Sequence, residues 1–188
     1  MRLILASASP RRADLLSRAG LEFDVCPTDV DESPVAGEPP DSYVVRVARD
    51  KARGAAQRRG TVRPVLGADT AVVVSGRVLG KPAHDDEARS MLRLLSGRVH
   101  EVLTGVALLS GRDEVKECVT TRVRFVSLTD QEIEWYVGTG EPRGKAGAYA
   151  IQGGASRFVD WIEGSWANVV GLPVATVYRM LRQAGVIC

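Results

Sequence analysis

Hydrophobic and polar positions follow two different periods along the chain. Apolar runs bounded by Gly, Pro, Asp or Ser predict β-strands over residues 2–6, 23–25, 65–74, 77–79, 99–109, 115–125, 157–162 and 166–170. In the most apolar of them, the segment 67–70 is expected to interrupt the strand. Ser75 and Gly76 predict a two-residue turn that joins residues 65–74 and 77–79 in a hairpin.

Apolar residues at helical spacing alternate with these strands. They predict helices over residues 10–19, 41–59, 85–95, 129–137 and 173–184. Asp41 and Thr129 are the expected N-caps of the second and fourth helices. A polar, proline-rich loop is expected at residues 27–40 and a glycine-rich segment at 138–154. Because helices, strands and hairpins are mixed, we expect an α/β fold with a mixed sheet.

The helix predicted at residues 41–59 carries a lysine on its apolar side. At ~100° per residue, Lys51 lies in the middle of an apolar stripe formed by Val44, Val47, Ala48 and Ala55. Lys51 either snorkels, with its stem covering the core, or meets a buried anion. Asp69 is the candidate partner, because a lone carboxylate in an apolar run is costly to bury unpaired. A lysine held there for a phosphate would contribute little to folding.

The predicted hairpin brings a second lysine towards Asp69. Its register places Lys81 opposite Thr70, on the face of Thr70 rather than that of Asp69. A bulge near Gly67 would be needed to bring Asp69 and Lys81 into one pocket. A purely structural Asp–Lys pair is the alternative interpretation.

Residues 7–12 have the features of an anion site. Ser9 and Pro10 form a strong helix start, and Arg11 and Arg12 follow in the first turn. Two cations at this end oppose the helix dipole unless an anion joins them. A phosphate would use the free N–H groups, the hydroxyls and both guanidinium groups. A solvated basic helix end is the alternative.

Two loop segments carry weaker signals. Asp31 and Glu32 lie in the proline-rich loop, where carboxylates are usually solvated. In the glycine-rich segment, Lys145 could reach a phosphate. Gln152 offers a donor and an acceptor side by side, which matches the N3–H and a carbonyl of uracil or thymine. A glycine-rich turn without a ligand is the alternative.

Composition and charge exclude several classes of protein. Of the 188 residues, 45% are hydrophobic and 26% are charged, which suits one globular domain, with or without two lobes. The net charge of +2 does not indicate a nucleic-acid partner. No apolar run approaches the ~20 residues that span a bilayer, so no membrane partner is expected.

Cysteine and lysine usage add two points. Cys26, Cys118 and Cys188 are far apart and form no C-x-x-C pair, which indicates a reducing, cytoplasmic compartment rather than a disulfide framework or zinc site. Among 25 basic residues, arginine is strongly preferred. A lysine retained against this bias indicates a position that needs a compact ammonium group. The alternative is that four scattered lysines have no functional significance. The four are Lys51, Lys81, Lys116 and Lys145.

Other familiar signatures are missing from the sequence. There is no P-loop motif, no G-x-G-x-x-G after a strand and no nucleophile elbow. His84 and His100 stand in no ligand spacing and are interpreted as surface or structural residues. The tryptophans do not repeat at a stacking interval, so we expect core packing for Trp135, Trp161 and Trp166.

Five segments, in this order along nearly the whole chain, resemble the Maf family of nucleotide pyrophosphatases: residues 5–12, 67–70, 80–82, 145–153 and 170–173. The resemblance implies a single domain over residues 1–188, with a two-lobed mixed sheet flanked by helices and a central cleft. This is the fold of the inosine triphosphate pyrophosphatases. It also implies hydrolysis between the α- and β-phosphates with a divalent cation, Mg²⁺ or Mn²⁺.

The resemblance further implies roles for single residues. Asp69 corresponds to the catalytic acidic residue, and Asp69 and Glu32 to the metal-binding positions. The phosphate-binding positions correspond to Ser7, Arg12, Lys51, Lys81 and Lys145. Arg11, Thr70 and Gln152 resemble the branch that prefers dTTP and UTP; the branch that prefers 7-methyl-GTP has an aromatic residue, Gln and Glu there. Whether Asp69 is the base or mainly a metal ligand stays open.

We therefore expect an enzyme that hydrolyses dTTP and UTP to the monophosphate and pyrophosphate. Modified pyrimidine nucleotides are further candidate substrates, in a house-cleaning role. The alternative class is a nucleotide-sensing regulator of cell division or septum formation, which needs the phosphate cradle but neither Asp69 nor a metal. The sequence leaves open whether the protein is a monomer or a homodimer.

Overall fold

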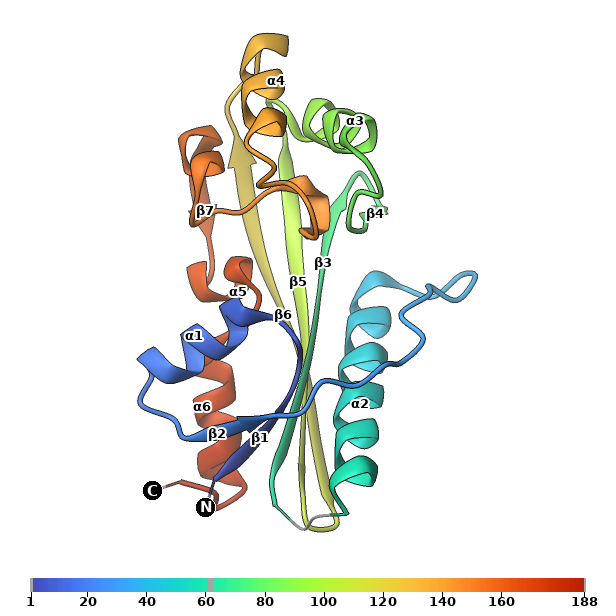
Figure 1. The fold of residues 1–188 in the computed structure, drawn as a ribbon, viewed down its shortest axis with the longest axis vertical. Coiled ribbons are helices and arrows are strands. Elements are labelled where there is room, and N and C mark those ends of the chain that lie inside the picture. The colour runs from blue at the N-terminus through green and yellow to red at the C-terminus, as the bar shows by residue number, and fades with distance from the viewer. Residues whose placement is uncertain (1, 61–62, 188) are drawn as a thin grey trace. The chain divides into compact units, whose positions relative to one another are not determined.

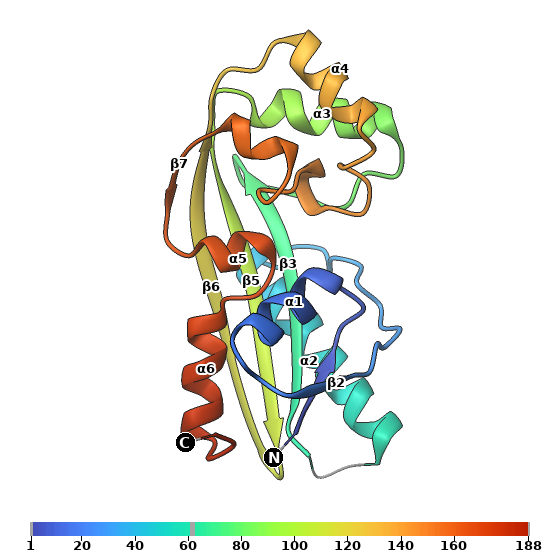
Figure 2. The same cartoon turned by 60° about the vertical axis from the view of Figure 1, so that its left-hand side comes forward.

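The computed structural model describes residues 2–60 and 63–187, in which helices and strands are mixed as expected (Figures 1 and 2). The elements in chain order are β1 (Leu3–Ala6), α1 (Pro10–Arg18), β2 (Phe23–Val25), α2 (Pro40–Arg59), β3 (Val65–Val74), β4 (Arg77–Leu79), α3 (Asp85–Leu95), β5 (Val99–Ser110), β6 (Asp113–Phe125), α4 (Asp130–Gly138), the 3₁₀ helices η1 (Ala146–Ala148) and η2 (Gly154–Phe158), β7 (Val159–Glu163), α5 (Trp166–Val170) and α6 (Val174–Gln183).

The strands form one mixed sheet of seven strands. Six of them follow the order β2-β1-β3-β5-β6-β7, and β4 pairs with β3. Strand β1 is parallel to β2 and to β3, whereas the pairs β3–β4 and β6–β7 are antiparallel. The hairpin register is the predicted one, with Val72 opposite Leu79 and Val74 opposite Arg77. The expected α/β class with a mixed sheet is therefore confirmed.

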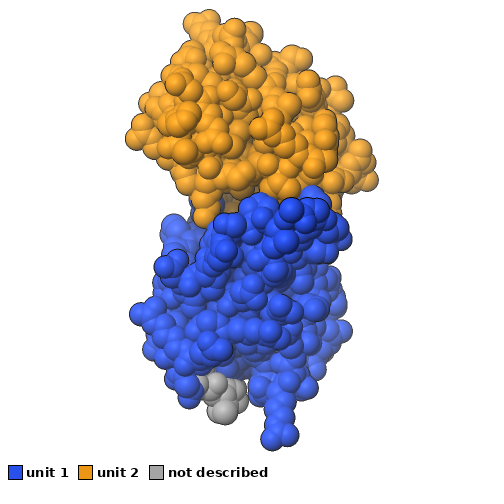
Figure 3. Space-filling model, turned by 90° about the vertical axis from the view of Figure 1, so that its right-hand side faces the viewer, with its two compact units in different colours: residues 1–70, 104–119, 171–188 blue, residues 71–103, 120–170 orange. Residues whose placement is uncertain are grey.

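The chain divides into two compact units, each assembled from separate stretches (Figure 3). Unit 1 comprises residues 1–70, 104–119 and 171–188, and unit 2 comprises residues 71–103 and 120–170. Strands β3, β5 and β6 each contribute residues to both units. The expectation that residues 1–188 act as a single domain stays a prediction.

Unit 1 owes its packing to small residues on α2 and on the strands beside it. Ala48, Ala52 and Ala55 on α2 are completely buried. A Cβ atom on Gly67 of β3 would lie 2.0 Å from the Ala48 carbonyl oxygen, and one on Gly105 of β5 would lie 2.2 Å from the Val44 carbonyl oxygen. The two glycines therefore let the α2 backbone lie directly against these strands.

Unit 2 has a core of aromatic rings. His100, Phe125 and Tyr149 meet edge to face with centroid separations of 4.9–5.4 Å. Tyr136 and Phe158 extend the cluster, with their ring centroids 5.4 Å apart. Helices α3 and α4 are joined on their exposed sides by the ion pairs Arg89–Glu134 and Arg93–Asp130. Edge-to-face rings of this kind fix one packing arrangement beyond the burial of area.

One predicted strand is wrong, and another is wrong in part. Residues 166–170 form helix α5, and residues 157–158 end the 3₁₀ helix η2 before β7 begins. The pattern around Val169 and Val170 is typical of a strand, but Asn168 is completely buried and donates to the Val102 carbonyl (2.9 Å) and to Thr121 Oγ1 (3.0 Å). These tertiary bonds favour the helical turn over the local β propensity.

Two smaller predictions are also wrong. Helix α2 begins at Pro40 with Pro39 as N-cap, so Asp41 lies in the first turn, where its carboxylate accepts from its neighbour, the Ser42 N–H. Strand β3 runs without interruption through residues 67–70. Because Gly67 packs against α2, the glycine serves close packing and does not end the strand.

All three tryptophans differ from the expected core packing. They are 42%, 37% and 47% exposed, for Trp135, Trp161 and Trp166. Arginine side chains cover two of the rings: the Arg157 guanidinium lies 4.0 Å from the Trp135 centroid, and that of Arg122 lies 5.8 Å from Trp161. Cation–π contacts let these large rings stay near water. In the described part of the chain, no helix is long and apolar enough to cross a membrane.

Candidate active site

An ammonium group joins two carboxylates in unit 1. Lys51 Nζ lies 2.7 Å from Asp69 Oδ1 and 2.8 Å from Glu32 Oε1. Lys51 and Asp69 are buried, at 7% and 6% exposure, whereas the Glu32 side chain is 40% exposed. Of the two interpretations of Lys51, the buried ion pair is confirmed and its partner is the expected one. The cluster therefore holds a buried carboxylate and opens towards solvent at Glu32.

The close approach of α2 to the sheet creates this ion pair. Asp69 lies on β3 two residues after Gly67, on the same face of the strand. Lys51 follows Ala48 by one helical turn, and Ala48 is the residue whose carbonyl contacts Gly67. The glycine contact and the ion pair are therefore successive contacts along the same interface.

The loop before α2 is held so that Glu32 reaches Lys51. The Tyr43 hydroxyl donates to the Glu32 carbonyl at 2.9 Å, and Arg46 donates to the Ser33 carbonyl at 3.0 Å. Burial, together with the charges of Asp69 and Glu32, raises the pKa of Tyr43 to about 12, so its hydroxyl stays a donor. The expectation of a merely solvated loop carboxylate is therefore only partly met by Glu32, which is 40% exposed but also forms an ion pair with Lys51.

A buried arginine forms the second part of the site in unit 1. Arg12 donates to the Gly171 carbonyl (2.8 Å), to Ser7 Oγ (3.0 Å) and to Thr70 Oγ1 (3.0 Å). In residues 2–60 and 63–187, no carboxylate lies within ion-pair distance of it. A guanidinium has five N–H donors, and these bonds occupy three of them. Arg12 therefore keeps donors for a further acceptor.

The electrostatics around Arg12 favour an anion. Burial lowers the pKa of Arg12, while the charge of Asp69 raises it and that of Arg11 lowers it. Burial also lowers the pKa of the half-buried Arg11. The first turn of α1 contains no acidic residue, so two cations share the positive end of the helix. A bound phosphate would relieve both the burial of charge and this repulsion.

The start of α1 is organised by Ser7 and not by the predicted cap. Ser9 has N-cap geometry, but its side chain makes no capping bond. Instead its N–H donates to Ser7 Oγ at 3.2 Å, and the same oxygen accepts from Arg12. Ser7 thus fixes both the chain entry into α1 and the arginine.

The hydroxyl of Thr70 points into the same network. Besides accepting from Arg12, Thr70 Oγ1 lies 3.0 Å from Thr104 Oγ1 and donates to the Gly171 carbonyl at 3.3 Å. Gly171 has φ of +127°, a conformation that L side chains rarely adopt, and this turns its carbonyl towards Arg12. In this structure Thr70 therefore orients the arginine.

The remaining predicted residues belong to unit 2. Lys81 is exposed two residues beyond the end of β4, so the ladder stops before the predicted pairing of Thr70 with Lys81. Lys145 is half-buried and donates to the Arg143 carbonyl at 3.2 Å. The two lysine segments are joined by a bond from the Gly147 N–H to the Gly80 carbonyl at 3.0 Å. Gln152 is exposed on a turn.

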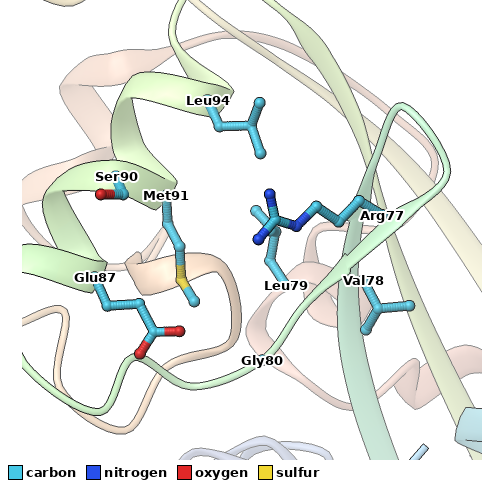
Figure 4. A pocket seen from close by; sticks show the side chains of 8 residues that line it. All are labelled: Arg77, Val78, Leu79, Gly80, Glu87, Ser90, Met91 and Leu94. Carbon is cyan, nitrogen blue, oxygen red and sulfur yellow. The ribbon is translucent and has the colours of Figure 1, made fainter.

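A small pocket in unit 2 is separate from these groups. It measures about 130 Å³ and lies between β4 and α3 (Figure 4), with a lining of Arg77, Val78, Leu79, Gly80, Glu87, Ser90, Met91 and Leu94. None of the predicted site residues lines it. Its volume is below the ~300 Å³ of typical small-molecule sites, so it does not suit a nucleoside triphosphate.

Several residues of the network were not found from the sequence. Gly105, and the packing role of Gly67, carried a usable signal, since an isolated glycine in a strand indicates close backbone approach. Thr104 and Tyr43 carried none, because their roles depend on contacts far apart in sequence. His84, interpreted as surface or structural, is the N-cap of α3 and accepts from the Glu87 N–H at 3.2 Å. His100 is buried, so it is structural.

The predicted metal ligands lie together but are few. Asp69 and Glu32 contact the same ammonium, so their carboxylates converge. No group of three or more His, Cys, Asp or Glu side chains suited to a metal occurs in the described residues. Two converging carboxylates fit a Mg²⁺ that takes its other ligands from water and phosphate.

Comparisons with known proteins agree with the resemblance. The sequence profile of a family described as Maf-like protein matches residues 2–184. A protein of Anaeromyxobacter dehalogenans (strain 2CP-C), named dTTP/UTP pyrophosphatase, is 55% identical over 188 residues, covering 98% of this chain and 94% of its own length. Proteins with the same name from Koribacter versatilis (strain Ellin345) and Geobacter sulfurreducens (strain ATCC 51573 / DSM 12127 / PCA) are 54% and 51% identical, covering 100% and 98% of this chain and 96% and 97% of their own lengths.

Among solved structures, one similar chain is titled as a nucleoside-triphosphatase / dITP/XTP pyrophosphatase from Mycobacterium abscessus ATCC 19977 / DSM 44196. It is 16% identical, covers 97% of both chains and gives a TM-score of 0.48.

Proposed function

The chain belongs to the Maf family, and from this membership we propose that it is a nucleoside triphosphate pyrophosphatase acting on dTTP and UTP. The observation that carries the proposal within the fold is the pairing of buried Asp69 with Lys51, beside a buried Arg12 that has no carboxylate partner among the described residues. An ion pair that only stabilises the fold does not require a nearby arginine with unused N–H donors. A site for a phosphate chain requires both the Asp69–Lys51 pair and such an arginine.

The reaction is a hydrolysis at the α-phosphorus. A water oxygen forms a bond to this phosphorus, and the bond from the phosphorus to the bridging oxygen between the α- and β-phosphates breaks. The products are the nucleoside monophosphate and pyrophosphate, and the proton of the water must pass to a base. A triphosphate brings roughly four negative charges, so positioning and charge compensation supply most of the catalysis.

We assign the base or orienting role to Asp69. Its carboxylate is paired with the Lys51 ammonium, whose Nζ lies 2.7 Å away. From this position it can orient a water for attack or accept its proton. The base and metal-ligand roles are both consistent with this position.

The cationic residues bind the phosphates in this proposal. Arg12 uses its remaining N–H donors, Ser7 adds a hydroxyl, and Lys51 shares its charge with the substrate. We also assign phosphate-binding roles to Lys81 and Lys145, which belong to unit 2. Compact ammonium groups suit this task because each acts as a point charge on the phosphate oxygens.

Three residues determine the choice of base in this proposal. Gln152 donates to a pyrimidine carbonyl and accepts from N3–H. Arg11 and Thr70 are the other two, and Thr70 acts at least partly through Arg12, to which it is bonded at 3.0 Å. Modified pyrimidine nucleotides with the same hydrogen-bonding edge would enter the same site, which supports a house-cleaning role.

Glu32 and Asp69 are the groups that would hold a divalent cation, Mg²⁺ or Mn²⁺. Their hard carboxylate oxygens suit such an ion, and the solvent-facing Glu32 leaves room for water ligands. When bound, the ion supplies charge neutralisation on the phosphates. We also propose a cytoplasmic location, because the nucleotide substrates are found there and the two described cysteines form no disulfide.

One experiment tests the proposal directly. The protein is incubated with UTP, dTTP, CTP, GTP and 7-methyl-GTP, with and without Mg²⁺, and pyrophosphate and monophosphate are measured. We expect release from UTP and dTTP that requires the metal, and a loss of at least about a thousandfold in kcat per folded molecule for Asp69→Asn. Tight UTP binding without hydrolysis by the wild type would instead indicate a nucleotide sensor.

A further inference from the structure

The residue proposed to read the base lies on a short, closed turn in unit 2. The Gly153 N–H donates to the Ala150 carbonyl at 3.1 Å and closes a turn over residues 150–153. Ile151 in this turn is buried, whereas Gln152 beside it is exposed. Within the described residues the Gln152 side chain forms no hydrogen bond, so its amide is available to a ligand.

A tyrosine and a glutamate hold both ends of this turn. Tyr136, at the end of α4, accepts from the Ala150 N–H at 3.0 Å through its hydroxyl oxygen. The same hydroxyl donates to Glu141 Oε1 at 2.8 Å. Glu141 Oε2 then accepts from the Gly154 N–H at 3.0 Å. The backbone on each side of Gln152 is therefore bonded to one Tyr–Glu pair.

The sequence of the turn is adapted to this pair. A Cβ atom on Gly153 would lie 2.3 Å from Glu141 Oε1, and one on Gly154 would lie 3.1 Å from the Trp135 ring. Only glycine at position 153 leaves room for the Glu141 carboxylate to lie against the backbone of the turn. Tyr136 is completely buried, and Thr139 Oγ1 donates to its carbonyl at 2.6 Å, so the pair stands on a rigid support.

We propose that Tyr136 and Glu141 are positioning residues for base recognition, which hold the turn so that the Gln152 amide meets the pyrimidine edge in one orientation. This inference rests on the proposed function, in which Gln152 reads the base. Its physical reason is preorganisation: an exposed amide on a loose turn loses conformational freedom on binding, and a turn bonded at both ends has lost that freedom already.

A double-mutant cycle with UTP tests the proposal. Tyr136→Phe removes one hydroxyl and keeps the ring, so the aromatic core is preserved. We expect kcat/KM for UTP to fall about tenfold, mainly through KM, in the wild-type background. In the Gln152→Ala background the same substitution should change kcat/KM less than about twofold, because there is no amide left to position.

Tyr149→Phe is the matched control. Tyr149 is also buried in unit 2, but its hydroxyl contacts His100 Nε2 at 2.9 Å and not the turn. Whatever its effect on kcat/KM, that effect should be equal with and without Gln152. Glu141→Gln keeps one acceptor oxygen, so its loss in kcat/KM should be smaller than that of Tyr136→Phe, and this loss too should almost disappear in the Gln152→Ala background. All kcat/KM values are calculated per folded molecule, and a thermal melt of each variant shows that it is folded.

Equal losses for Tyr136→Phe in both backgrounds would overturn the positioning role while wild-type UTP hydrolysis still supports the proposed function. Should Tyr136→Phe fail to fold, Glu141→Gln decides by the same comparison. No pyrophosphate from UTP or dTTP with the wild type would overturn the proposed function, and this inference with it.

Discussion

At the scale of single residues, Lys51 contacts two carboxylates that differ in their exposure to water. Asp69 is buried with it, whereas Glu32 is partly solvated. A buried ion pair adds little net stability compared with apolar groups, but removing one partner leaves an uncompensated charge. The structure therefore changes the expectation that this lysine contributes little to folding.

We expect Lys51→Met to lower the free energy of unfolding by about 3–5 kcal/mol, because Asp69 would stay buried without a counter-charge. Urea denaturation at pH 7 measures this loss. The double variant Lys51→Met/Asp69→Asn should recover a large part of it, since neither position then buries an unpaired charge. A Lys51→Met variant as stable as the wild type would show that water reaches Asp69.

His100 gives a second prediction at this scale. Burial lowers its pKa from 6.5 to about 4, and the side chain is only 1% exposed. The folded state resists protonation, so the stability contributed by neutral His100 is complete above pH 6.5 and is lost as the pH falls towards 4. Between pH 7 and pH 5 this loss amounts to about 2 kcal/mol.

The measurement compares wild type with His100→Leu by urea denaturation at pH 7 and pH 5. The variant loses the Tyr149 hydrogen bond and should be less stable at pH 7. On going from pH 7 to pH 5, the free energy of unfolding of the variant should fall by about 2 kcal/mol less than that of the wild type. Parallel pH profiles would mean that His100 is protonated in the folded state.

At the scale of elements, the position of α2 depends on two glycines in the strands beneath it. A Cβ atom on Gly67 would meet the Ala48 carbonyl oxygen at 2.0 Å, and backbone cannot move aside as a flexible side chain can. We expect Gly67→Ala to destabilise the protein by about 2–3 kcal/mol through overpacking. It should also lower kcat, because α2 carries Lys51.

Gly138→Ala is a suitable control for this prediction. Gly138 is the last residue of α4, and a Cβ atom there would meet no atom within 4 Å. Its stability should change by less than about 1 kcal/mol, or rise slightly. Thermal melts and UTP turnover of both variants provide the test. Equal behaviour of the two alanine variants would contradict the close-approach argument.

Elements differed in how far their sequence determined them. Helix α4 was predicted together with its cap, because Thr129 and Glu132 form a capping box that is local in sequence. Helix α5 was predicted as a strand, because its helical turn depends on Asn168 bonding to residues more than 40 positions away. Local sequence signals therefore predicted an element whose terminal hydrogen bonds are made by neighbouring residues. They did not predict an element that depends on hydrogen bonds to distant residues.

At the scale of the whole molecule, the sheet class and the Lys51–Asp69 pair could be predicted from periodicity and from the cost of burying charge. The bonds from Arg12 to Gly171 and from Tyr43 to Glu32 could not, because their spacings of 159 and 11 residues have no periodic signature. The roles of Lys81, Lys145 and Gln152 stay predictions, since they concern a substrate.

Ligand binding gives a prediction for the whole chain. A non-hydrolysable UTP analogue with Mg²⁺, at a hundred times its Kd, should stabilise the folded state by about 2.7 kcal/mol. For a chain of this length, that corresponds to a rise in Tm of about 5–11 °C. Differential scanning calorimetry measures the shift in Tm. The control is the corresponding GTP analogue at the same concentration as the UTP analogue. An equal shift with both analogues would argue against selection of the pyrimidine base.

Unit 1 is built from three separated stretches of chain, which has a consequence for vectorial synthesis on the ribosome. Arg12 emerges early, but its acceptor Gly171 is translated more than 150 residues later. Unit 2 ends at Val170, so all of its residues are translated before Gly171 and the buried face of α6. Although domains generally fold from the N-terminus as they are made, in this chain the bond from Arg12 to the Gly171 carbonyl cannot form until the last stretch is made. The arginine proposed to bind phosphate is therefore among the last side chains to complete its hydrogen bonds in a newly made molecule.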